Sequence, residues 1–464
     1  MLTVKIDGRA LKCDVGENLY KLFLREGVEL CAPCGGNGTC GKCKVLLGGT
    51  QTVKACEYIV TEDITVDRYT ALGEIAMSGR FRDVNIDGLS PFIAVDIGTT
   101  TVVAYLISGG EIVDTESGMN AQKSYGDDVI TRIQYVMDNE DGCFVLHEAI
   151  RKQVSGMVSA LCGRNGVKTD SIAISGNTTM LHLYAGISPA SIGVSPFTPV
   201  FTDVKKIGNT ILLPSVSGYV GADTVMAILA SGMHLSDEMC LLVDIGTNGE
   251  IALGNKDGIL TCSAAAGPAF EGAQISCGCG GIVGAINSVK LGADVTYTTI
   301  GGAPPVGICG SAILDIAAQM LALEMIDETG FFEDEELVIA DGISVTAGDI
   351  RQVQLAKAAI AAGVKTLLNE TSTDVSEIKK CFLAGGFGSF LNKKSACDIG
   401  LLPAELLEKV EVIGNAAGMG TVLWQVSSEC RAETDEIMKN IRYTELSDSS
   451  FFQSEFIECM NFAP

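Results

Sequence analysis

The stretch that decides the fold is Phe92-Ile-Ala-Val-Asp-Ile-Gly-Thr-Thr-Thr101, in which an apolar run ends in an aspartate and a polar turn. A second apolar run continues to Ile107, so the segment predicts a strand, a turn and a return strand. The same order recurs in Cys240-Leu-Leu-Val-Asp-Ile-Gly-Thr-Asn-Gly-Glu250. A duplicated strand, turn and strand predicts two lobes of similar architecture.

Both turns carry residues suited to phosphate. Glycine lets a phosphate approach the backbone, and threonine hydroxyls and turn N–H groups donate to its oxygens. An aspartate at a strand end is placed to hold a hydrated Mg²⁺. An ordinary β-hairpin with a glycine turn explains either copy alone but explains the pair poorly. The sequence contains no Walker A motif, which disfavours a P-loop fold. The predicted phosphate-binding residues are Gly98, Thr99, Thr100, Gly246, Thr247 and Asn248, and the predicted catalytic residues are Asp96, Asp244 and Glu250.

A glycine-rich loop near the N-terminus carries closely spaced cysteines. Cys34, Cys40 and Cys43 lie on this loop, Cys56 follows it, and Cys31 precedes it. Glycines let the backbone wrap around an iron–sulfur cluster and direct N–H groups at its sulfurs. Four thiolates also suit zinc, but zinc ribbons prefer two Cys-x2-Cys pairs on separate knuckles. The spacing therefore favours an iron–sulfur cluster over zinc.

Composition limits the function classes. The 464 residues are 47% hydrophobic and 19% charged, which is the balance of a chain with a large core. A net charge of −25 argues against binding to nucleic acid or to anionic membrane surfaces. No apolar window is long enough to span a bilayer, and the N-terminus is charged where a signal peptide is apolar. We therefore expect a cytoplasmic protein.

The charge distribution divides the chain. Acidic and basic residues balance over the first eighty residues, so the whole negative charge belongs to the rest. We expect a domain at residues 1–80, a linker at 81–91, one lobe at 92–237 and a second lobe at 238–464, with a C-terminal helix and tail returning to the first lobe. Lys42, Lys44 and Lys54 lie near the cysteine loop and form a candidate docking surface, although exposed lysines are usually only solvated.

Residues 1–75 resemble the plant and adrenodoxin type of [2Fe–2S] ferredoxin, through the cysteine loop and the stretch from Ala55 to Val66. The resemblance implies a β-grasp fold with Cys34, Cys40, Cys43 and Cys56 as cluster ligands. Cys31 departs from the family pattern and is expected to be a spare thiol.

The remainder resembles the superfamily of acetate and sugar kinases, heat-shock chaperone ATPases and actin. The two turns correspond to the phosphate motifs of this superfamily. The segment from Ala173 to Met180, which contains Asn177, corresponds to its connecting motif. The segment from Leu383 to Ser389 corresponds to its adenosine motif. The resemblance implies a two-lobed, actin-like α/β ATPase that uses ATP and Mg²⁺. It adds Asn177, Gly385, Gly386 and Gly388 to the predicted nucleotide-binding residues.

Further blocks make nearly the whole chain similar to the reductive activators of corrinoid proteins. They include Gly307-Ile-Cys-Gly-Ser311, Asp349-Ile-Arg351 and Gly414-Asn-Ala-Ala-Gly418. The resemblance implies an enzyme of anaerobic methyltransferase systems that uses ATP to drive an electron from its [2Fe–2S] cluster to a Co(II) corrinoid, restoring Co(I). It implies a corrinoid protein and a low-potential electron donor as partners and leaves a homodimer open.

Two alternative functions remain at this point. One is an ATP-driven reductant of another low-potential enzyme, such as a 2-hydroxyacyl-CoA dehydratase, and the other is a redox-sensing nucleotide-binding module without turnover. Larger family members insert a linker and a small middle domain after the ferredoxin, whereas only about fifteen residues lie there in this chain. Cys277, Cys279 and Cys309 could form a second cluster, but small buried residues beside a ligand are the simpler interpretation.

Overall fold

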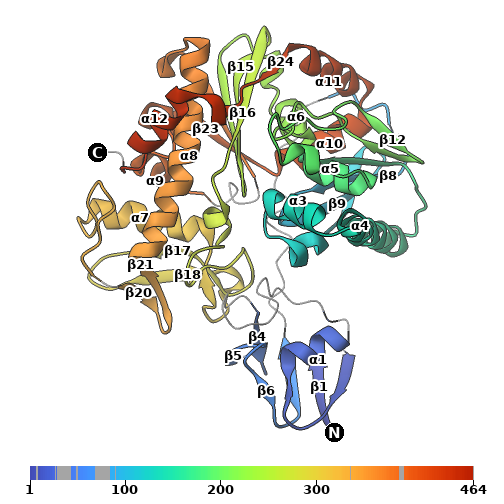
Figure 1. Cartoon of the computed structure of the whole chain (residues 1–464), viewed down its shortest axis with the longest axis vertical. Coiled ribbons are helices and arrows are strands. Elements are labelled where there is room, and N and C mark those ends of the chain that lie inside the picture. The colour runs from blue at the N-terminus through green and yellow to red at the C-terminus, as the bar shows by residue number, and fades with distance from the viewer. Residues whose placement is uncertain are drawn as a thin grey trace.

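The computed structural model describes residues 1–6, 9–26, 28, 43–48, 51–67, 84–88, 90–334, 336–385 and 391–462. It shows a small N-terminal domain and a larger part built from two lobes (Figure 1). In the described ranges, no helix combines the length and the apolar character needed to cross a bilayer.

The N-terminal domain has the expected β-grasp arrangement. Its sheet has the order β2-β1-β7-β4-β5, in which β1 runs antiparallel to β2 and parallel to β7. Asn18 caps helix α1 (Leu19–Arg25) by accepting the N–H of Lys21, and the helix buries Leu22 and Phe23 in the core of the sheet. The strands are β1 (Leu2–Ile6), β2 (Arg9–Cys13), β4 (Lys44–Leu47), β5 (Gln51–Lys54) and β7 (Ile64–Asp67), and β3 (Glu17–Asn18) pairs with β6 (Ile59–Val60).

The two lobes repeat one sheet topology. Each begins with an antiparallel meander of three strands and adds two parallel strands beside the first one. The sixth strand lies at an edge, beside β13 in the first sheet and beside β16 in the second. The first sheet has the order β10-β9-β8-β11-β13-β12, and the second has the order β23-β22-β14-β15-β16-β24. The first contains β8 (Phe92–Ile97), β9 (Thr101–Ser108), β10 (Glu111–Met119), β11 (Ile172–Gly176), β12 (Lys205–Ile207) and β13 (Thr210–Leu212). The second contains β14 (Cys240–Ile245), β15 (Gly249–Asn255), β16 (Gly258–Ala264), β22 (Lys380–Ala384), β23 (Val410–Gly414) and β24 (Ile441–Tyr443).

Alternating side chains place helices on both faces of the first sheet. Ile93 and Val95 share a core with helix α4 (Gly142–Asn165), whereas Phe92 and Ala94 pack with helix α10 (Ala416–Val426). This follows from the period of two in a strand, which sends successive side chains to opposite faces. The remaining helices of this lobe are α3 (Val129–Asp138), α5 (Thr178–Ala185) and α6 (Ala222–Ser231).

Helices α6 and α10 form a central layer that belongs to both lobes. Leu242 of β14 and Phe382 of β22 share one hydrophobic core with α6 and with the first sheet. Gly420 of α10 lies so close to α6 that a Cβ would stand 2.0 Å from the carbonyl oxygen of Met226. Helix α10 follows β23, an edge strand of the second sheet, yet it packs on the strands of the first lobe.

The outer face of the second sheet is covered by α8, and α7 shares the same hydrophobic core. Leu241, Val243 and Ile245 of β14 point into this second core. The helices are α7 (Gly310–Ala322), α8 (Ala347–Thr371) and α9 (Lys393–Asp398), and small sheets are formed by β17 (Ala285–Lys290), β18 (Thr296–Thr299) and β19 (Gly307–Ile308), and by β20 (Glu336–Ala340) and β21 (Ile343–Thr346).

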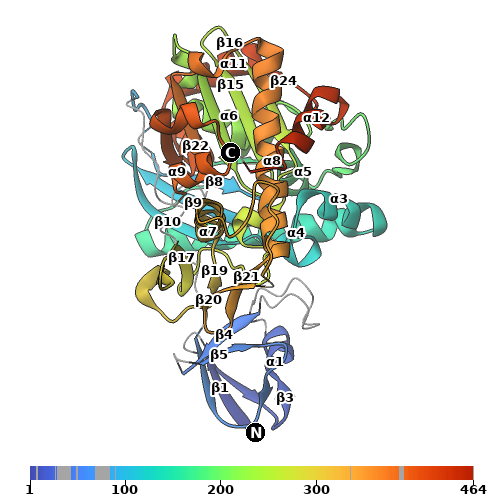
Figure 2. The same ribbon diagram turned by 90° about the vertical axis from the view of Figure 1, so that its left-hand side faces the viewer.

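The C-terminal segment crosses both lobes. Helix α11 (Ser428–Asn440) packs against α6 of the first lobe. Strand β24 then pairs with β16, and α12 (Ser450–Glu458) lies beside α8 in the second lobe (Figures 1 and 2). The buried ammonium of Lys357 donates to the carbonyl of Asn461, which fixes the end of the chain on α8.

Residues 84–88 are docked on the ATPase part. The N–H groups of Asp87 and Gly88 donate to the carbonyl of Val426 at 3.0 and 2.9 Å. The carboxylate of Asp87 accepts the N–H of Ser428 at 2.9 Å and lies 3.5 Å from the guanidinium of Arg431. The segment that leads from the ferredoxin domain is therefore anchored where α10 meets α11.

The central layer provides a test of the packing. Gly420→Ala should lower the free energy of unfolding by about 1–3 kcal/mol, because the new methyl group must displace the backbone of α6. Gly156→Ala in α4 is the matched control, since no atom lies within 4 Å of its Cβ position, and it should be neutral or slightly stabilising. Denaturant unfolding measures both changes, and equal effects would show that α6 and α10 are less tightly packed than described.

Candidate functional site

The two glycine turns have the same construction. Asp96 is the last residue but one of β8, and Asp244 is the last residue but one of β14. Each strand returns as the antiparallel β9 or β15. The N–H of Gly98 donates to the carbonyl of Thr101 at 2.9 Å, and the N–H of Gly246 donates to the carbonyl of Asn248 at 3.0 Å. Each turn therefore has a glycine and hydroxyl groups at the end of a central strand.

Three side chains hold the first turn in position. The amide of Asn177 donates to the hydroxyl of Thr99 at 3.0 Å, and its oxygen caps α5 by accepting the N–H of Met180. The amide of Asn120 donates to the carbonyl of Gly98 at 2.8 Å. The guanidinium of the fully buried Arg132 donates to the carbonyl of Thr99 at 2.5 Å. The connecting segment thus positions the first turn through Asn177.

A glutamate from the second lobe joins the two turns. One carboxylate oxygen of Glu271, Oε2, accepts the hydroxyl of Thr100 at 2.6 Å and the hydroxyl of Thr247 at 3.1 Å. Sequence reasoning missed Glu271. The only available signal was its place between two glycine-containing stretches, Ala266-Gly-Pro268 and Gly272-Ala273, shortly after the second hairpin.

Four carboxyl groups gather at the ends of the two sheets: Asp96, Asp223, Asp244 and Glu250. Loss of hydration is the main cause that raises the pKa of Asp96 to about 7, that of Asp223 to about 6 and that of Asp244 to about 8. It also raises the pKa of Glu250 well above its ordinary value. Repulsion from Asp223 adds to the shifts of Asp96, Asp244 and Glu250, whereas hydrogen bonds from Asn415 and Ser175 oppose the shift of Asp96.

Asp223 was also missed. It lies in the first turn of α6, a helix that is otherwise almost wholly apolar and buried. An acidic residue at the start of such a helix is the signal that could have identified it, because a lone carboxyl beside a core needs a compensating partner. Its nearness to the other three groups depends on the central layer, which the sequence does not reveal.

The carboxyl cluster suits a hydrated cation. Within the described part of the chain, no three His, Cys, Asp or Glu side chains come together closely enough to hold a metal ion directly. Mg²⁺ usually keeps several of its waters and binds proteins through one or two carboxylates. The geometry is therefore compatible with carboxylates that bind the waters of a magnesium ion.

The segment expected to bind adenosine is only partly described. Gly385 has φ +100°, and a Cβ there would lie 2.5 Å from the carbonyl oxygen of Ile245 and 2.7 Å from Oδ1 of Asp244, so only glycine fits. Gly386 and Gly388 lie outside the described residues. The N–H of Gly385 donates to the carbonyl of Gly414 at 3.0 Å, which places this segment beside the start of α10.

In the ferredoxin domain, Cys43 and Cys56 lie side by side. Their sulfur atoms are 3.1 Å apart, and the backbone N–H of Cys56 also points at the sulfur of Cys43 at 3.4 Å. The amide of Asn18, the cap of α1, donates to the carbonyl of Cys56 at 2.8 Å. Converging thiols with an amide donor fit an iron–sulfur cluster. Cys31, Cys34, Cys40, Lys42 and the side chain of Lys44 lie outside the described residues.

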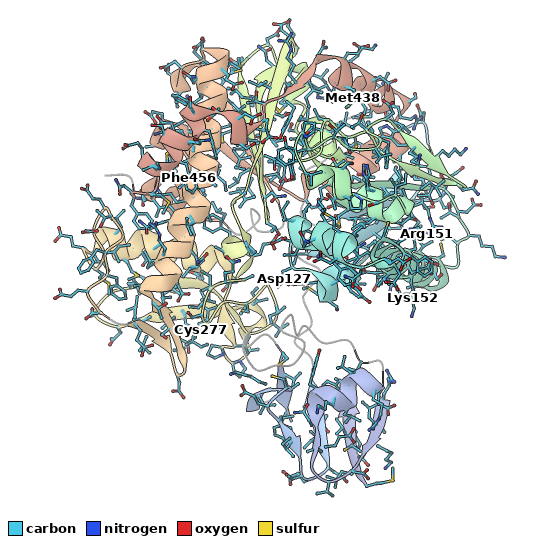
Figure 3. The ribbon with its side chains drawn as sticks, in the orientation of Figure 1. Asp127, Arg151, Lys152, Cys277, Met438 and Phe456 are labelled. Carbon is cyan, nitrogen blue, oxygen red and sulfur yellow. The ribbon has the colours of Figure 1, made fainter. Side chains whose placement is uncertain are left out.

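Cys277, Cys279 and Cys309 belong to a tightly packed loop of the second lobe. Cys277, labelled in Figure 3, is partly exposed, and its thiol lies 3.9 Å from the carbonyl oxygen of Gly342. Cys279 and Cys309 take part in the packing of β19, and the thiol of Cys309 contacts the hydroxyl of Ser311 at 3.1 Å. Among the described residues, these thiols are not part of a group that could hold a metal ion.

The fold and the site define an actin-like ATPase that carries its own iron–sulfur domain. Three family profiles match consecutive parts of the chain. A 2Fe-2S iron-sulfur cluster binding domain matches residues 1–71, the RACo middle region matches residues 92–236, and the C-terminal domain of RACo, the ASKHA domain, matches residues 238–464. The family's middle region therefore corresponds here to the lobe that contains the first turn.

The chain belongs to the RACo family. It is 33% identical over 415 residues to the corrinoid activation enzyme RamQ of Eubacterium limosum, a match that covers 79% of this chain and 70% of that protein. A [Co(II) methylated amine-specific corrinoid protein] reductase of Methanosarcina barkeri is 27% identical over 249 residues, covering 48% of this chain and 46% of that protein. The solved structure of a reductive activator for corrinoid, iron-sulfur protein has a TM-score of 0.75 and 29% identity, covering all of this chain and 98% of that one.

The carboxyl cluster predicts how stability depends on pH. Because the pKa values of Asp96, Asp223 and Asp244 are raised on folding, the folded chain binds more protons than the unfolded chain from about pH 4 upwards. Stability is therefore lost as the pH rises through this range toward the folded pKa of about 8 of Asp244.

We expect the free energy of unfolding of the nucleotide-free protein to be higher at about pH 6 than at about pH 8. Asp244→Asn should reduce this difference in unfolding free energy by on the order of 2 kcal/mol. The exposed Asp257→Asn is the control and should leave the difference unchanged. Denaturant unfolding at both pH values checks this. If Asp244→Asn had no more effect than Asp257→Asn, the carboxyl group of Asp244 would be ionised normally.

Proposed function

We propose that this chain is an ATP-dependent reductive activator that delivers one electron from its [2Fe–2S] ferredoxin domain to the Co(II) corrinoid of a methyl-transfer protein, restoring Co(I). The observation that carries the proposal is the presence, in one chain, of paired cluster thiols and of two facing phosphate turns. The relatives named as corrinoid activation enzyme and corrinoid protein reductase support this choice of substrate.

The chain's residues have separable roles in nucleotide binding. The hydroxyls of Thr99, Thr100 and Thr247 and the turn N–H groups bind the phosphates. Gly98, Gly246 and Asn248 allow this close approach. Asn177 fixes the first turn from α5, while Gly385, with Gly386 and Gly388, forms the contact to the adenosine part.

The carboxyl groups act on metal-bound and attacking water. Asp96 and Asp244 bind the waters of Mg²⁺, and Glu250 assists in orienting the water that attacks the terminal phosphate. Raised pKa values suit this role, because a carboxyl group that titrates near neutral pH can accept a proton and release it again. Hydrolysis then breaks the bond to the terminal phosphate, and the products are ADP and phosphate.

A [2Fe–2S] cluster held by Cys34, Cys40, Cys43 and Cys56 supplies single electrons at low potential. The chain's own contribution is to hold the thiols together and to exclude water from Cys43, which is fully buried. A low-potential donor restores the electron after each transfer, so one electron enters for each Co(II) that becomes Co(I).

ATP is needed because reduction of Co(II) is uphill for ordinary [2Fe–2S] potentials. A nucleotide can alter this equilibrium only through different affinities of the two lobe arrangements for the corrinoid protein. Closure of the two turns on ATP changes the surface offered to the corrinoid protein, and hydrolysis resets it. The shared helices α6 and α10 are suited to transmit this change, because they pack against both sheets.

The nucleotide roles predict selective loss of turnover. Asp96→Ala or Asp244→Ala should lower Mg²⁺-dependent ATP hydrolysis by roughly a hundredfold or more, because the waters of the metal lose their carboxylate. The visible absorption of the cluster should be unchanged, since both residues are remote from the ferredoxin domain in sequence. Phosphate release measures turnover. Unaltered turnover in both variants would remove these carboxylates from the mechanism.

Reduction of a corrinoid protein tests the function itself. With a low-potential reductant and ATP, the protein should convert a Co(II) corrinoid protein of a methyl-transfer system to Co(I), seen by ultraviolet–visible spectroscopy. Cys56→Ser should abolish Co(I) formation while keeping the ATP site, and Asp244→Ala should abolish it while keeping the cluster.

Controls without ATP and with ADP should give no Co(I). If the protein hydrolyses ATP but reduces no corrinoid protein and instead activates a 2-hydroxyacyl-CoA dehydratase, the choice of substrate is wrong. If it turns over no ATP under any of these conditions, the activator role fails altogether.

A further inference from the structure

Glu271 connects the two phosphate turns across the lobes. Thr100 belongs to the first lobe, whereas Thr247 and Glu271 belong to the second. Both hydroxyls donate to the same carboxylate oxygen, at 2.6 and 3.1 Å. A threonine hydroxyl carries one hydrogen, so in this state neither hydroxyl has a hydrogen left to donate to a phosphate.

The other carboxylate oxygen of Glu271 lies over the second turn. A Cβ built on Gly246 would stand 3.7 Å from Oε1 of Glu271. The carboxylate thus contacts the hydroxyl of Thr247 and approaches the glycine of the same turn. These are the groups through which the proposed function binds a phosphate.

Glu271 is held by a rigid segment. It ends the short helix η4 (Pro268–Glu271), whose Ala269 and Phe270 are almost completely buried. The next residue, Gly272, has φ +74°, and a Cβ there would lie 2.1 Å from the carbonyl oxygen of Cys279. The carboxylate is therefore placed by the fold of the second lobe and is not a surface side chain that happens to reach the turns.

Helix α3 supplies a positive charge, that of Arg132, which holds the first turn and interacts electrostatically with this carboxylate. In the described structure, the buried guanidinium of Arg132 hydrogen-bonds only uncharged acceptors, namely Gly126, Thr99, Gln122 and Met180. Its charge is attracted by Glu271 and by Asp127 and Asp128, and Asp127 lies on the first lobe near the second (Figure 3). Two hydroxyl donors and a nearby cation make an anion-binding position, and the chain fills it with its own carboxylate.

We infer that Glu271 occupies the position of the terminal phosphate of ATP and thereby sets the discrimination between ATP and ADP. This inference rests on the proposed nucleotide site. A triphosphate reaches the hydroxyls of Thr100 and Thr247 and must displace the carboxylate. A diphosphate ends one phosphate earlier and leaves Glu271 in place, so the displacement weakens the binding of ATP only.

The exchange of Glu271 for the terminal phosphate also explains how the site distinguishes the ATP-bound state from the ADP-bound and nucleotide-free states. With ADP or no nucleotide, Glu271 links the lobes. With ATP, the terminal phosphate makes that link and Glu271 is released. The two links differ in charge and shape, so the lobes have different preferred arrangements in the two states. Glu271 is a positioning and specificity residue here, and the proton-accepting role stays with the carboxyl cluster.

The experiment is calorimetric titration with β,γ-imido-ATP and with ADP, each in the presence of Mg²⁺. Glu271→Gln removes the charge with little change in size. It should tighten binding of β,γ-imido-ATP by roughly tenfold to a hundredfold, because a charge-assisted hydrogen-bond pair no longer competes. Binding of ADP should stay within about twofold of the parent.

Glu370→Gln is the matched control. The carboxylate of Glu370 also accepts a threonine hydroxyl, that of Thr444 at 2.6 Å, but neither residue belongs to a phosphate turn. Both nucleotides should bind this variant as they bind the parent. Glu271→Asp, which keeps the charge but has a shorter reach, should lie between the parent and Glu271→Gln, and it serves as the test if Glu271→Gln does not fold.

The outcomes separate the inference from the proposed function. Equal tightening of both nucleotides, or an unchanged ratio of their dissociation constants, would overturn the role of Glu271 while leaving the ATP site intact. Weaker binding of β,γ-imido-ATP to Glu271→Gln would show that the carboxylate helps to bind the triphosphate, which also overturns the inference. If the parent protein binds neither nucleotide, the nucleotide site itself is wrong.

Discussion

Four carboxyl groups converge where the two central strands end, and the rest of the structure depends on how their repulsion is relieved. Asp96 and Asp244 come from equivalent positions of the duplicated sheets, and Asp223 is brought to them by helix α6. Burial is the main cause that raises the pKa values, and repulsion from Asp223 adds to the shifts of Asp96 and Asp244, so without a cation protons are the available compensation. A hydrated metal ion accompanying a polyphosphate can replace those protons. The acidic cluster is therefore a cost to the fold, and in the proposed function it is the reason that the site prefers a metal-bound nucleotide.

Residues beside this carboxyl cluster connect the nucleotide site to helix α10, which both lobes share. Asn415 begins α10 by capping it through the N–H of Gly418, and its amide donates to the hydroxyl of Tyr105 in β9. The same amide is a hydrogen-bond partner of Asp96. A change in the charge of Asp96 is therefore felt at the start of the helix that both lobes share. The contact between the nucleotide site and the central layer is direct, and no long chain of intermediates is required.

The sequence predicted the parts of this molecule that repeat. The duplicated Asp-Ile-Gly-Thr turns indicated two lobes, and the spacing of the cysteines indicated an iron–sulfur cluster, because local chemistry alone decides both. The ferredoxin fold was implied by the family resemblance. The family comparisons and the sheet topology confirm the two-lobed ATPase fold and the ferredoxin domain. The assignment of individual residues to nucleotide or metal remains a prediction throughout.

Other features depend on contacts between distant segments, and the sequence could not reveal them. Glu271 and Asp223 look like ordinary acidic residues until the lobes bring them to the turns. Helix α6 buries Val225 and Met226 in the core, but its first turn brings the carboxyl group of Asp223 to the site. The return of α10 to the first lobe was equally hidden, because an apolar helix does not show which of two sheets it will cover.

The docked segment around Asp87 affects how the ferredoxin domain encounters the ATPase part. Because residues 84–88 are fixed at the junction of α10 and α11, the ferredoxin domain is tethered at one defined point of the ATPase. A domain tethered by the same chain meets its own ATPase at an effective concentration set by the connection. The encounter is then independent of how much protein the cell contains. Weak contacts between the two parts then suffice to bring them together.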